Sequence, residues 1–423
     1  MTYDVIIYGA SGFTGEFIAK EISKYYNYSF AIAGRSQAKL QKIADSITTR
    51  KPDGIIIADV KNENSLLEMC KQGKLIINAV GPYRFYGIPV MKAAVESSCH
   101  YVDISGEPYF IELAEFQLNH LAEKNNVYAI SACGFDSIPS DMGVEYTRQQ
   151  FLKKYPKAAN ETSNRPKLNE IQAYLSFDTS DTYGYTAHAT TLECAVHGFS
   201  TVRDLIKLRK ESKAKNPLLP AEGPRGAHKK EFHAVPESKN SKIAIKFPGS
   251  DRSIVLRSQQ RIARYTDEKR QNQGLHNVIQ FFMYATMTNS IFTKLKGAIF
   301  GFVLTFLTKW AFWRKQIIKY PKFYSLGAFS HEGPSLEQVE NTKFYLDFYG
   351  KGVNGAMIKT RVSGPDPGYI GTAAMVSCAA ATILEDEKMM PGEGGVMTTA
   401  FGFRDTKLYE RLEKRGLVFE TLN

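Results

Sequence analysis

Residues 3–25 read YDVIIYGASGFTGEFIAKEISKY, and this stretch decides the fold expected for the chain. Its first six residues form an apolar, β-branched run that predicts a buried parallel strand. Its last ten residues predict an amphipathic helix with Phe17, Ile18 and Ile22 on one face. Three glycines, spaced three residues apart, lie between them. A strand, a glycine-rich turn and a helix in this order are the context that a dinucleotide-binding motif needs.

Each of the three glycines has a predicted role in such a motif. Gly9 permits a tight turn, Gly12 lets the backbone approach a pyrophosphate, and Gly15 lets the helix pack closely on the strand. The free N–H groups and the positive dipole end of the helix favour phosphates there. We therefore predict a dinucleotide site that includes Gly9, Ser11, Gly12, Phe13, Thr14 and Gly15. The alternative is a glycine-rich turn without a ligand.

The next predicted strand, residues 29–36 (SFAIAGRS), bears on which dinucleotide is bound. An Asp or Glu about 20 residues after the last glycine would bind the ribose 2′-hydroxyl of NAD(H). The strand ends instead in Arg35 and Ser36, which suit a 2′-phosphate through charge-assisted hydrogen bonds. We therefore predict NADP(H) in preference to NAD(H). A solvated loop arginine is the alternative for Arg35.

Two further strands bring polar residues to the same edge of the predicted sheet. Residues 54–60 (GIIIADV) carry Asp59, which we expect near the adenine. Residues 74–83 (KLIINAVGPY) end in Asn78, Gly81 and Pro82. Ligands of doubly wound sheets lie beyond the carboxyl ends of the strands, so these three residues are predicted on the nicotinamide side. The alternation of strands and helices predicts an α/β Rossmann domain with a parallel sheet.

Composition limits the possible partners. The 423 residues carry a net charge of +11, which favours nucleic acid, an anionic membrane or an anionic cofactor. The basic stretch 209–230 has almost no aromatic residues, so it predicts a solvated loop or a membrane contact rather than nucleic-acid binding. Five scattered cysteines without a C-x-x-C pair fit a reduced intracellular compartment. His188 and His197 lack metal-ligand spacing, so no metal is predicted.

The middle of the chain predicts a second unit. Residues 241–247, 252–262 and 342–352 have strand patterns that indicate an antiparallel or mixed sheet. Residues 297–313 (GAIFGFVLTFLTKWAFW) are nearly all apolar and contain one charge. Three alternatives remain for them: a helix buried in the second domain, a helix or hairpin in a lipid interface, and a bilayer span.

Five motifs in order resemble the saccharopine dehydrogenase-like oxidoreductases, which are related to saccharopine reductase and to bacterial trans-acting enoyl reductases. The motifs are GASGFTG (9–15), AGRS (33–36), NAVGPYRFYG (78–87), HYVDISGEP (100–108) and GFDSIPSDMG (134–143). GYIGTAA (368–374) and GGVMTTAFGF (394–403) extend the resemblance over almost the whole chain. It implies a Rossmann domain over residues 1–145, completed by residues 366–423, and a second α/β domain over residues 146–365.

The resemblance also implies a function. The expected protein is an NAD(P)H-dependent oxidoreductase that reduces an apolar or lipid-linked substrate at a membrane or lipid-droplet surface. Its expected partners are the nicotinamide nucleotide, a lipid-linked molecule and the lipid surface, without nucleic acid; a homodimer and a mitochondrial location are left open. The alternative is a non-catalytic nucleotide-binding or scaffold protein at lipid surfaces. A lysine-pathway enzyme would need an arginine cluster for the carboxylates of saccharopine, and none stands out.

Hydride transfer also needs a proton source near the strand ends. We predict Tyr83 or a bound water as proton donor and Asp136 as a further catalytic candidate. Packing of Tyr83 on the nicotinamide is one alternative. The other is that Asp136 and Ser137 cap a helix that begins at Ile138. Three more polar candidates follow the fifth strand: Asp103, Ser105 and Glu107.

Overall fold

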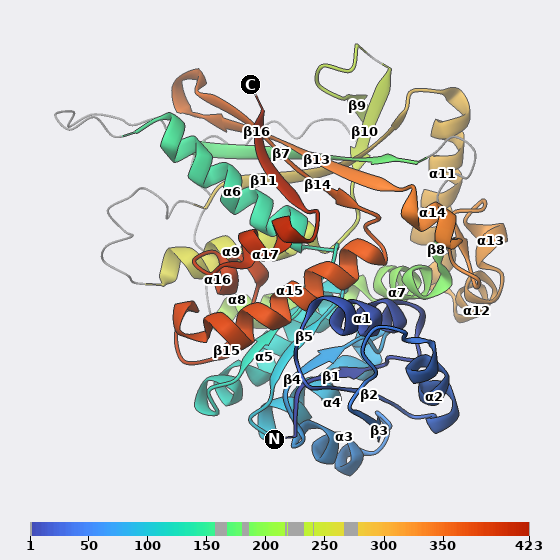
Figure 1. Cartoon of the computed structure of the whole chain (residues 1–423). Coiled ribbons are helices and arrows are strands. Elements are labelled where there is room, and N and C mark those ends of the chain that lie inside the picture. Colours follow the sequence, from blue (N-terminus) through green and yellow to red (C-terminus); the bar gives the residue numbers. More distant parts are fainter. Residues whose placement is uncertain are drawn as a thin grey trace.

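The structure, a computed structural model, describes residues 2–156, 167–179, 186–215, 218, 232–239, 241–265 and 278–422. Two seven-stranded sheets, each with its own helices, lie one above the other (Figure 1). The first sheet is parallel throughout, in the order β15-β6-β5-β4-β1-β2-β3. Its strands are β1 (Tyr3–Tyr8), β2 (Phe30–Gly34), β3 (Gly54–Ile57), β4 (Gly73–Asn78), β5 (His100–Asp103), β6 (Tyr128–Ile130) and β15 (Gly395–Met397). This is the predicted doubly wound Rossmann fold.

Alternation along β1 explains how this sheet is covered on both faces. Val5 and Ile7 contribute to one buried cluster, whereas Ile6 and Tyr8 contribute to another on the opposite face. Successive side chains of a strand point to opposite faces, so a continuous apolar run needs helices on both. One face carries α1 (Phe13–Tyr25), α2 (Gln37–Ser46) and α15 (Ile370–Asp386); the other carries α3 (Glu63–Cys70), α4 (Tyr83–Glu96) and α5 (Pro108–Lys124).

The C-terminal part of the chain is divided between the two sheets. β15 pairs with β6 in the parallel sheet, and α15, almost wholly buried, packs against α1. The last strand, β16 (Val418–Leu422), pairs with β14 of the second sheet instead. The domain limits 1–145 and 366–423 stay a prediction. Because β16 pairs with the second sheet, the end of the C-terminal segment also connects the two units.

The second sheet is mixed, as predicted, in the order β16-β14-β13-β7-β11-β10-β9. β7 and β11 are parallel, and the other described pairs are antiparallel. Its strands before β16 are β7 (Leu168–Asp178), β9 (Phe232–Ala234), β10 (Lys242–Lys246), β11 (Gln280–Thr288), β13 (Lys343–Gly352) and β14 (Met357–Pro365). Helices α6 (Ile138–Lys154) and α9 (Asp251–Arg264) pack against it.

Two sequence predictions in this half are wrong. Residues 252–262 form helix α9 rather than a strand, because Ile254, Ser258 and Ile262 recur every fourth residue on its buried face. The predicted loop 209–230 begins as helix: α8 (Val202–Lys215) buries Leu208, and Arg209 forms an ion pair with Glu112. The remainder of that stretch, apart from residue 218, lies outside the described residues.

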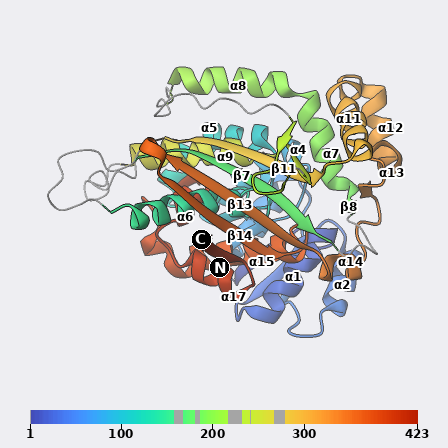
Figure 2. The same cartoon turned by 90° about the horizontal axis from the view of Figure 1, so that it is seen from above.

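A group of short elements completes the molecule. The apolar stretch 297–313 falls in α11 (Ile291–Thr305), the short helical turn η1 (Leu307–Lys309) and α12 (Ala311–Lys319), followed by α13 (Pro321–Tyr324). These elements pack on α7 (Ala189–Ser200) at one side of the molecule (Figure 2). The remaining elements are β8 (Ala187–His188), β12 (Phe329–Ser330), α14 (Leu336–Glu340), α16 (Thr399–Phe403) and α17 (Leu408–Lys414).

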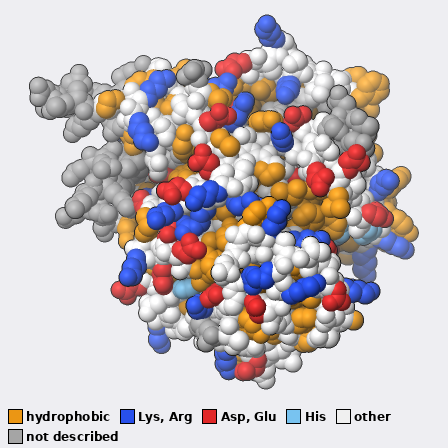
Figure 3. All heavy atoms as spheres, in the orientation of Figure 1, with side chains coloured by type: hydrophobic (Ala, Val, Ile, Leu, Met, Phe, Trp, Pro, Cys, Tyr) orange, Lys and Arg blue, Asp and Glu red, His pale blue; other side chains and the backbone are white. Residues whose placement is uncertain are grey.

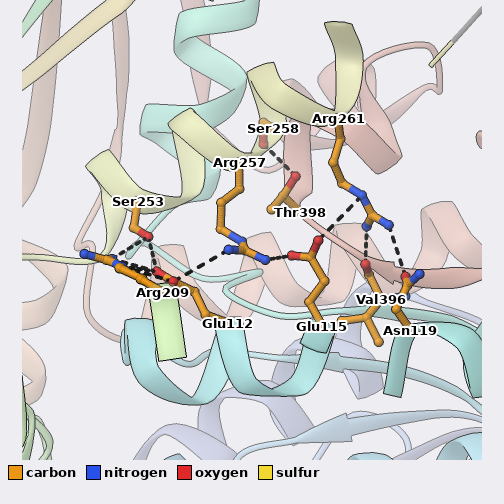
Figure 4. A network of polar contacts seen from close by, with 10 residues as sticks. All are labelled: Glu112, Glu115, Asn119, Arg209, Ser253, Arg257, Ser258, Arg261, Val396 and Thr398. Atoms are coloured by element: carbon orange, nitrogen blue, oxygen red, sulfur yellow. Dashed lines mark hydrogen bonds and ion pairs between the residues drawn. The ribbon is translucent and has the colours of Figure 1, made fainter. Parts of the chain in front are cut away.

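Charged side chains hold α9 against the Rossmann unit (Figure 4). On α5, Glu112 accepts hydrogen bonds from Arg209 of α8 at 2.6 Å and from Ser253 of α9 at 2.7 Å. Arg257 of α9 forms an ion pair with Glu115 of α5 and lies 3.6 Å from Glu112. Because Glu112 is buried, the arginines compensate a carboxylate that would be costly to leave unpaired. The network therefore fixes the second unit relative to the strand ends of the first.

Candidate functional site

The glycine turn after β1 has the geometry that phosphate binding needs. Gly9 has φ +91°, a left-handed conformation that favours glycine. A Cβ on Gly15 would lie 2.2 Å from the carbonyl oxygen of Gly9, so only glycine fits there. Gly12 is the N-cap of α1, and no side chain caps this helix end. An uncapped helix N-terminus of this kind favours a bound anion, so phosphate contact at the turn stays a prediction.

Residues predicted for the adenosine half gather at the ends of β2 and β3. Ser11 of the turn lies near Gly34, since its Oγ is 3.8 Å from a Cβ built there. Arg35 is exposed, and no carboxylate forms an ion pair with it within the described ranges. Ser36 caps α2 by accepting the Lys39 N–H at 3.4 Å. An unpaired guanidinium and a hydroxyl at this edge fit a 2′-phosphate.

The other two predicted contacts of this half have structural partners. Asp59 is half-buried after β3, where its Oδ1 accepts the Lys61 N–H at 3.0 Å. Thr14 lies half-buried in the first turn of α1. Contact of Asp59 or Thr14 with the cofactor stays a prediction.

Phe13, also in the turn, faces the second unit. Its ring stacks on His188 of β8 at 5.3 Å between centroids and meets Tyr369, before α15, edge-on at 4.8 Å. The Tyr369 hydroxyl in turn accepts the His188 N–H at 2.8 Å. An aromatic contact therefore joins the glycine turn to the second unit. No pattern in the sequence indicates this pairing, because the three residues are far apart along the chain.

Asp103 organises the carboxyl ends of β4, β5 and β6. Its Oδ1 accepts the N–H groups of Ser105 and Ala132, at 2.9 and 3.0 Å. Its Oδ2 accepts the hydroxyls of Tyr101 and Ser131, both at 2.9 Å. Burial raises the pKa of Asp103 to about 6, against the effect of these four donors. Asp103 thus acts as a positioning residue beneath the site.

Asn78 belongs to the same buried network. Its amide nitrogen donates to the Tyr101 hydroxyl at 2.9 Å, and its Oδ1 accepts the Val80 N–H at 3.0 Å. The side chain is fully buried, so it shapes the loop containing Gly81 and Pro82 from within. Direct contact of Asn78 with a nicotinamide stays a prediction that its hydrogen bonds do not favour.

Tyr83 lies at the start of α4 rather than in a loop after β4. Its ring stacks on Phe110, and its hydroxyl donates to the Asn78 carbonyl at 2.9 Å. Burial, and then the nearby Asp103, raise the pKa of Tyr83 well above its ordinary value. Glu107 accepts the N–H groups of Tyr83 and Arg84 at 2.7 and 3.2 Å, which caps α4 from outside. A hydroxyl already donated in this way favours a structural role for Tyr83 over proton donation.

Asp136 has a different environment. A Cβ on Gly106, after β5, would lie 2.6 Å from Oδ2 of Asp136, so the carboxyl lies over the end of that strand. Burial raises the pKa of Asp136. Within the described part of the chain no hydrogen bond reaches its carboxyl oxygens, and no side-chain bond caps α6 at Ser137. Ser137 is the N-cap residue of α6, which begins at Ile138 as the capping alternative expects, but neither side chain makes a capping hydrogen bond among the described residues. The Asp136 carboxyl is therefore a candidate ligand contact.

Helix α7 forms one wall beside these strand ends. Sγ of Cys194 would lie 3.9 Å from a Cβ on Gly81. Arg84 donates to the carbonyl of His197 at 3.0 Å and also bonds Thr201, after the helix. Cys194 and this arginine link were missed by sequence reasoning, because only the packing of α7 brings them to the site.

Comparisons with known proteins agree with this geometry. Residues 5–130 match the saccharopine dehydrogenase NADP binding domain. The human saccharopine dehydrogenase-like oxidoreductase is 34% identical over 445 aligned positions, which cover 100% of this chain and 97% of the relative. The chain belongs to the saccharopine dehydrogenase-like oxidoreductase family. The resemblance read from the motifs is therefore confirmed.

Two further similarities bear on location and fold. A Caenorhabditis elegans relative named lipid droplet localized protein is 33% identical, covering 99% of this chain and 98% of its own length. The fold is similar to that of saccharopine dehydrogenase (L-Glu forming) from Saccharomyces cerevisiae, with a TM-score of 0.56 over 100% of both chains. The identity with the yeast enzyme is 11%, so this likeness concerns the fold alone.

Proposed function

We propose that the protein is an NADP(H)-dependent oxidoreductase that reduces an apolar or lipid-linked substrate at a membrane or lipid-droplet surface. The observation that carries the proposal is the glycine turn, with an uncapped α1 N-terminus and an exposed Arg35 that has no ion pair among the described residues. A family match to an NADP binding domain over the same residues supports it.

Arg35 and Ser36 support the preference for NADP(H) over NAD(H). A 2′-phosphate here would accept hydrogen bonds from a guanidinium and a hydroxyl, and no acid replaces them at the end of β2. Asp59 stands at the end of the neighbouring strand, but its carboxylate accepts a local backbone N–H.

We assign the proton donor to Asp136 in preference to Tyr83. When bound, the nicotinamide supplies hydride chemistry. The chain must then hold a proton near the strand ends, and a carboxyl with a raised pKa keeps its proton to higher pH than an exposed one. The Tyr83 hydroxyl donates a hydrogen bond to the backbone, whereas the Asp136 carboxyl accepts none from the residues that the structure describes.

An apolar surface supports action on lipids. By length and composition alone, the segment Ile291–Lys309, which is α11 together with η1, could cross a membrane, and 17% of its most apolar 18-residue window is buried. The exposure of most of this segment supports the two lipid-contacting alternatives for residues 297–313 over a buried core helix. The name of the nematode relative places that protein on lipid droplets. Microscopy of the tagged protein in cells would separate a droplet location from the mitochondrial alternative.

The proposal is tested by titrating the purified protein with NADPH and NADH and following nucleotide fluorescence. We expect NADPH to bind more tightly than NADH. Arg35→Ala removes a charge-assisted contact and is expected to weaken NADPH binding about 10- to 100-fold, with NADH nearly unchanged. Lys42→Ala, an exposed cation on α2, is the control and should leave both affinities unchanged. Failure of both nucleotides to bind would contradict the proposal.

A further inference from the structure

The aromatic cap, defined as residues 291–324 from α11 to α13, exposes an apolar stripe. The stripe runs along α11 at spacings of three and four residues, which place its members on one helix face. Its members, with their exposed fractions, are Phe292 (75%), Leu295 (57%), Ile299 (42%), Phe302 (53%) and Phe306 (49%). Soluble surfaces rarely carry so continuous an apolar face without a partner.

The end of the cap adds aromatic residues to this face. An open apolar pocket of about 400 Å³ lies between α11 and α12, lined by Phe302, Phe306, Leu307, Trp310, Phe312 and Trp313. Phe312 and, on α13, Phe323 are also more than half exposed. Aromatic side chains of this kind collect at membrane–water interfaces.

The positive charge of the aromatic cap indicates which kind of surface covers its apolar face. Between residues 291 and 330 the chain has seven Lys and Arg residues and no Asp or Glu. Hydrophobic, basic and a few acidic side chains lie together at the right-hand edge of the molecule in Figure 3, where Figure 1 places these helices. A second copy of the chain would bring like charges together, whereas anionic phospholipid head groups would complement them.

The packing of α11 decides between lying in the interface and spanning a bilayer. Val303 and Leu304 are buried in a cluster with Leu192 of α7 and Ile317 of α12. One side of α11 is therefore attached to protein rather than free to face lipid. The segment Ile291–Lys309 has span length only when η1 is counted with α11. The 15 residues of α11 itself reach about 22 Å, less than the roughly 30 Å of a hydrocarbon core. The chain then turns at η1 instead of continuing.

We propose that the aromatic cap docks the protein in the interface of an anionic phospholipid surface, without spanning it. The α11 stripe and the aromatic end insert among the acyl chains, to a depth of about 5–10 Å. The cations around them contact the head groups. This inference rests on the lipid-surface part of the proposed function and adds the segment, the lipid charge and the mode of binding.

Docking in this way brings the candidate site close to the lipid. Helix α7 contacts the cap through Leu192 and Val196, and its Cys194 faces the Gly81 loop at the strand ends. Helix α7 therefore lies between the aromatic cap and the strand ends of the Rossmann sheet (Figure 2).

Intrinsic fluorescence gives a direct test, because the chain has only two tryptophans, Trp310 and Trp313, and both lie in the cap. The protein is mixed with phosphatidylcholine vesicles, with or without phosphatidylserine. We expect a blue shift with the anionic vesicles and quenching by lipids brominated on their acyl chains. An unchanged spectrum with both kinds of vesicle would overturn the proposal. So would a blue shift that appears without vesicles and grows with protein concentration, since that indicates a second copy.

Paired variants locate the contact. Phe302→Ser/Phe306→Ser removes two exposed rings, and we expect vesicle binding about 100-fold weaker. Val202→Ser/Ile206→Ser removes two residues of similar exposure on α8 and should leave binding unchanged. Lys294→Glu/Lys296→Glu should abolish the preference for anionic vesicles. Equal loss in the α8 control would contradict docking through the cap. NADPH titration of each variant keeps the results separate from the proposed function, because nucleotide binding should persist in all of them.

Discussion

Glycines have opposite surroundings in the glycine turn and in the aromatic cap. At Gly15 of the turn, a Cβ would lie 2.2 Å from the Gly9 carbonyl oxygen, whereas at Gly297 and Gly301 of α11 it would meet nothing within 4 Å. The turn is determined by close backbone packing inside the protein. The aromatic cap packs against protein on one side only. Its structure therefore also depends on whether water or lipid contacts its other side.

The difference shows how far a local pattern can be interpreted. Glycines at fixed spacing between a strand and a helix are explained by the close approach of backbone to backbone at the turn, which the structure shows at Gly15. An apolar run has several possible reasons, because hydrophobicity favours removal from water without specifying protein or lipid as the partner. The cap is as apolar as a core helix and yet remains largely exposed.

The largest expected difference between the two regions comes from adding one methyl group to a glycine in each of them. Gly15→Ala should abolish NADPH binding and lower the free energy of unfolding by more than about 3 kcal/mol, because backbone must move to relieve the contact. Gly297→Ala lies inside a helix with free space and should stabilise it by up to about 1 kcal/mol. Calorimetry and NADPH titration measure both variants. Normal NADPH binding by Gly15→Ala would break the comparison, since the turn would then tolerate what its geometry forbids.

A second prediction separates chemistry from docking. Asp136→Asn should lower turnover about 10²- to 10⁴-fold, as loss of a general acid does, while NADPH and vesicle binding stay normal. In the unchanged protein, the acid is active when protonated, so the rate of reduction should fall as pH rises through its raised pKa. Asp136→Asn should lose this dependence.

The measurement is NADPH oxidation with lipid-linked enones and imines, followed across a pH series. Asp59→Asn is the matched control, because it removes a carboxyl group on the predicted adenosine side. It should leave the pH profile of turnover unchanged. Full turnover by Asp136→Asn would assign the proton to another group, with bound water the first candidate.

The smallest of the three effects concerns two residues of α12. Ile317 is fully buried against α7, so Ile317→Ala should destabilise the cap by about 2–5 kcal/mol. Phe312, with 63% of its surface exposed, is expected to change stability by no more than about 0.5 kcal/mol on substitution to Ala. Denaturant unfolding followed by tryptophan fluorescence reports on the cap directly. A large loss in Phe312→Ala would mean that the exposed face already has a partner within the protein.

Much of the fold could be predicted because its signals are local. The strand, glycine turn and helix of residues 3–25, the parallel sheet and the family follow from motifs of a few residues each. The error at residues 252–262 arose because a short apolar run resembles a strand, and only the buried spacing of Ile254, Ser258 and Ile262 identifies a helix. The helical start of the predicted loop at Arg209 depended on a partner, Glu112, about a hundred residues away.

The sequence by itself determined the Rossmann fold, the position of the glycine turn and the position of Arg35 at the end of β2. Each of these depends on neighbours along the chain. Only the tertiary structure decided which polar groups are available at the strand ends. It joined the Tyr83 hydroxyl to a backbone carbonyl, whereas no such bond reaches the Asp136 carboxyl from the described part of the chain. It also placed one face of α11 on α7 and the other outside, because burial depends on which surfaces meet in three dimensions.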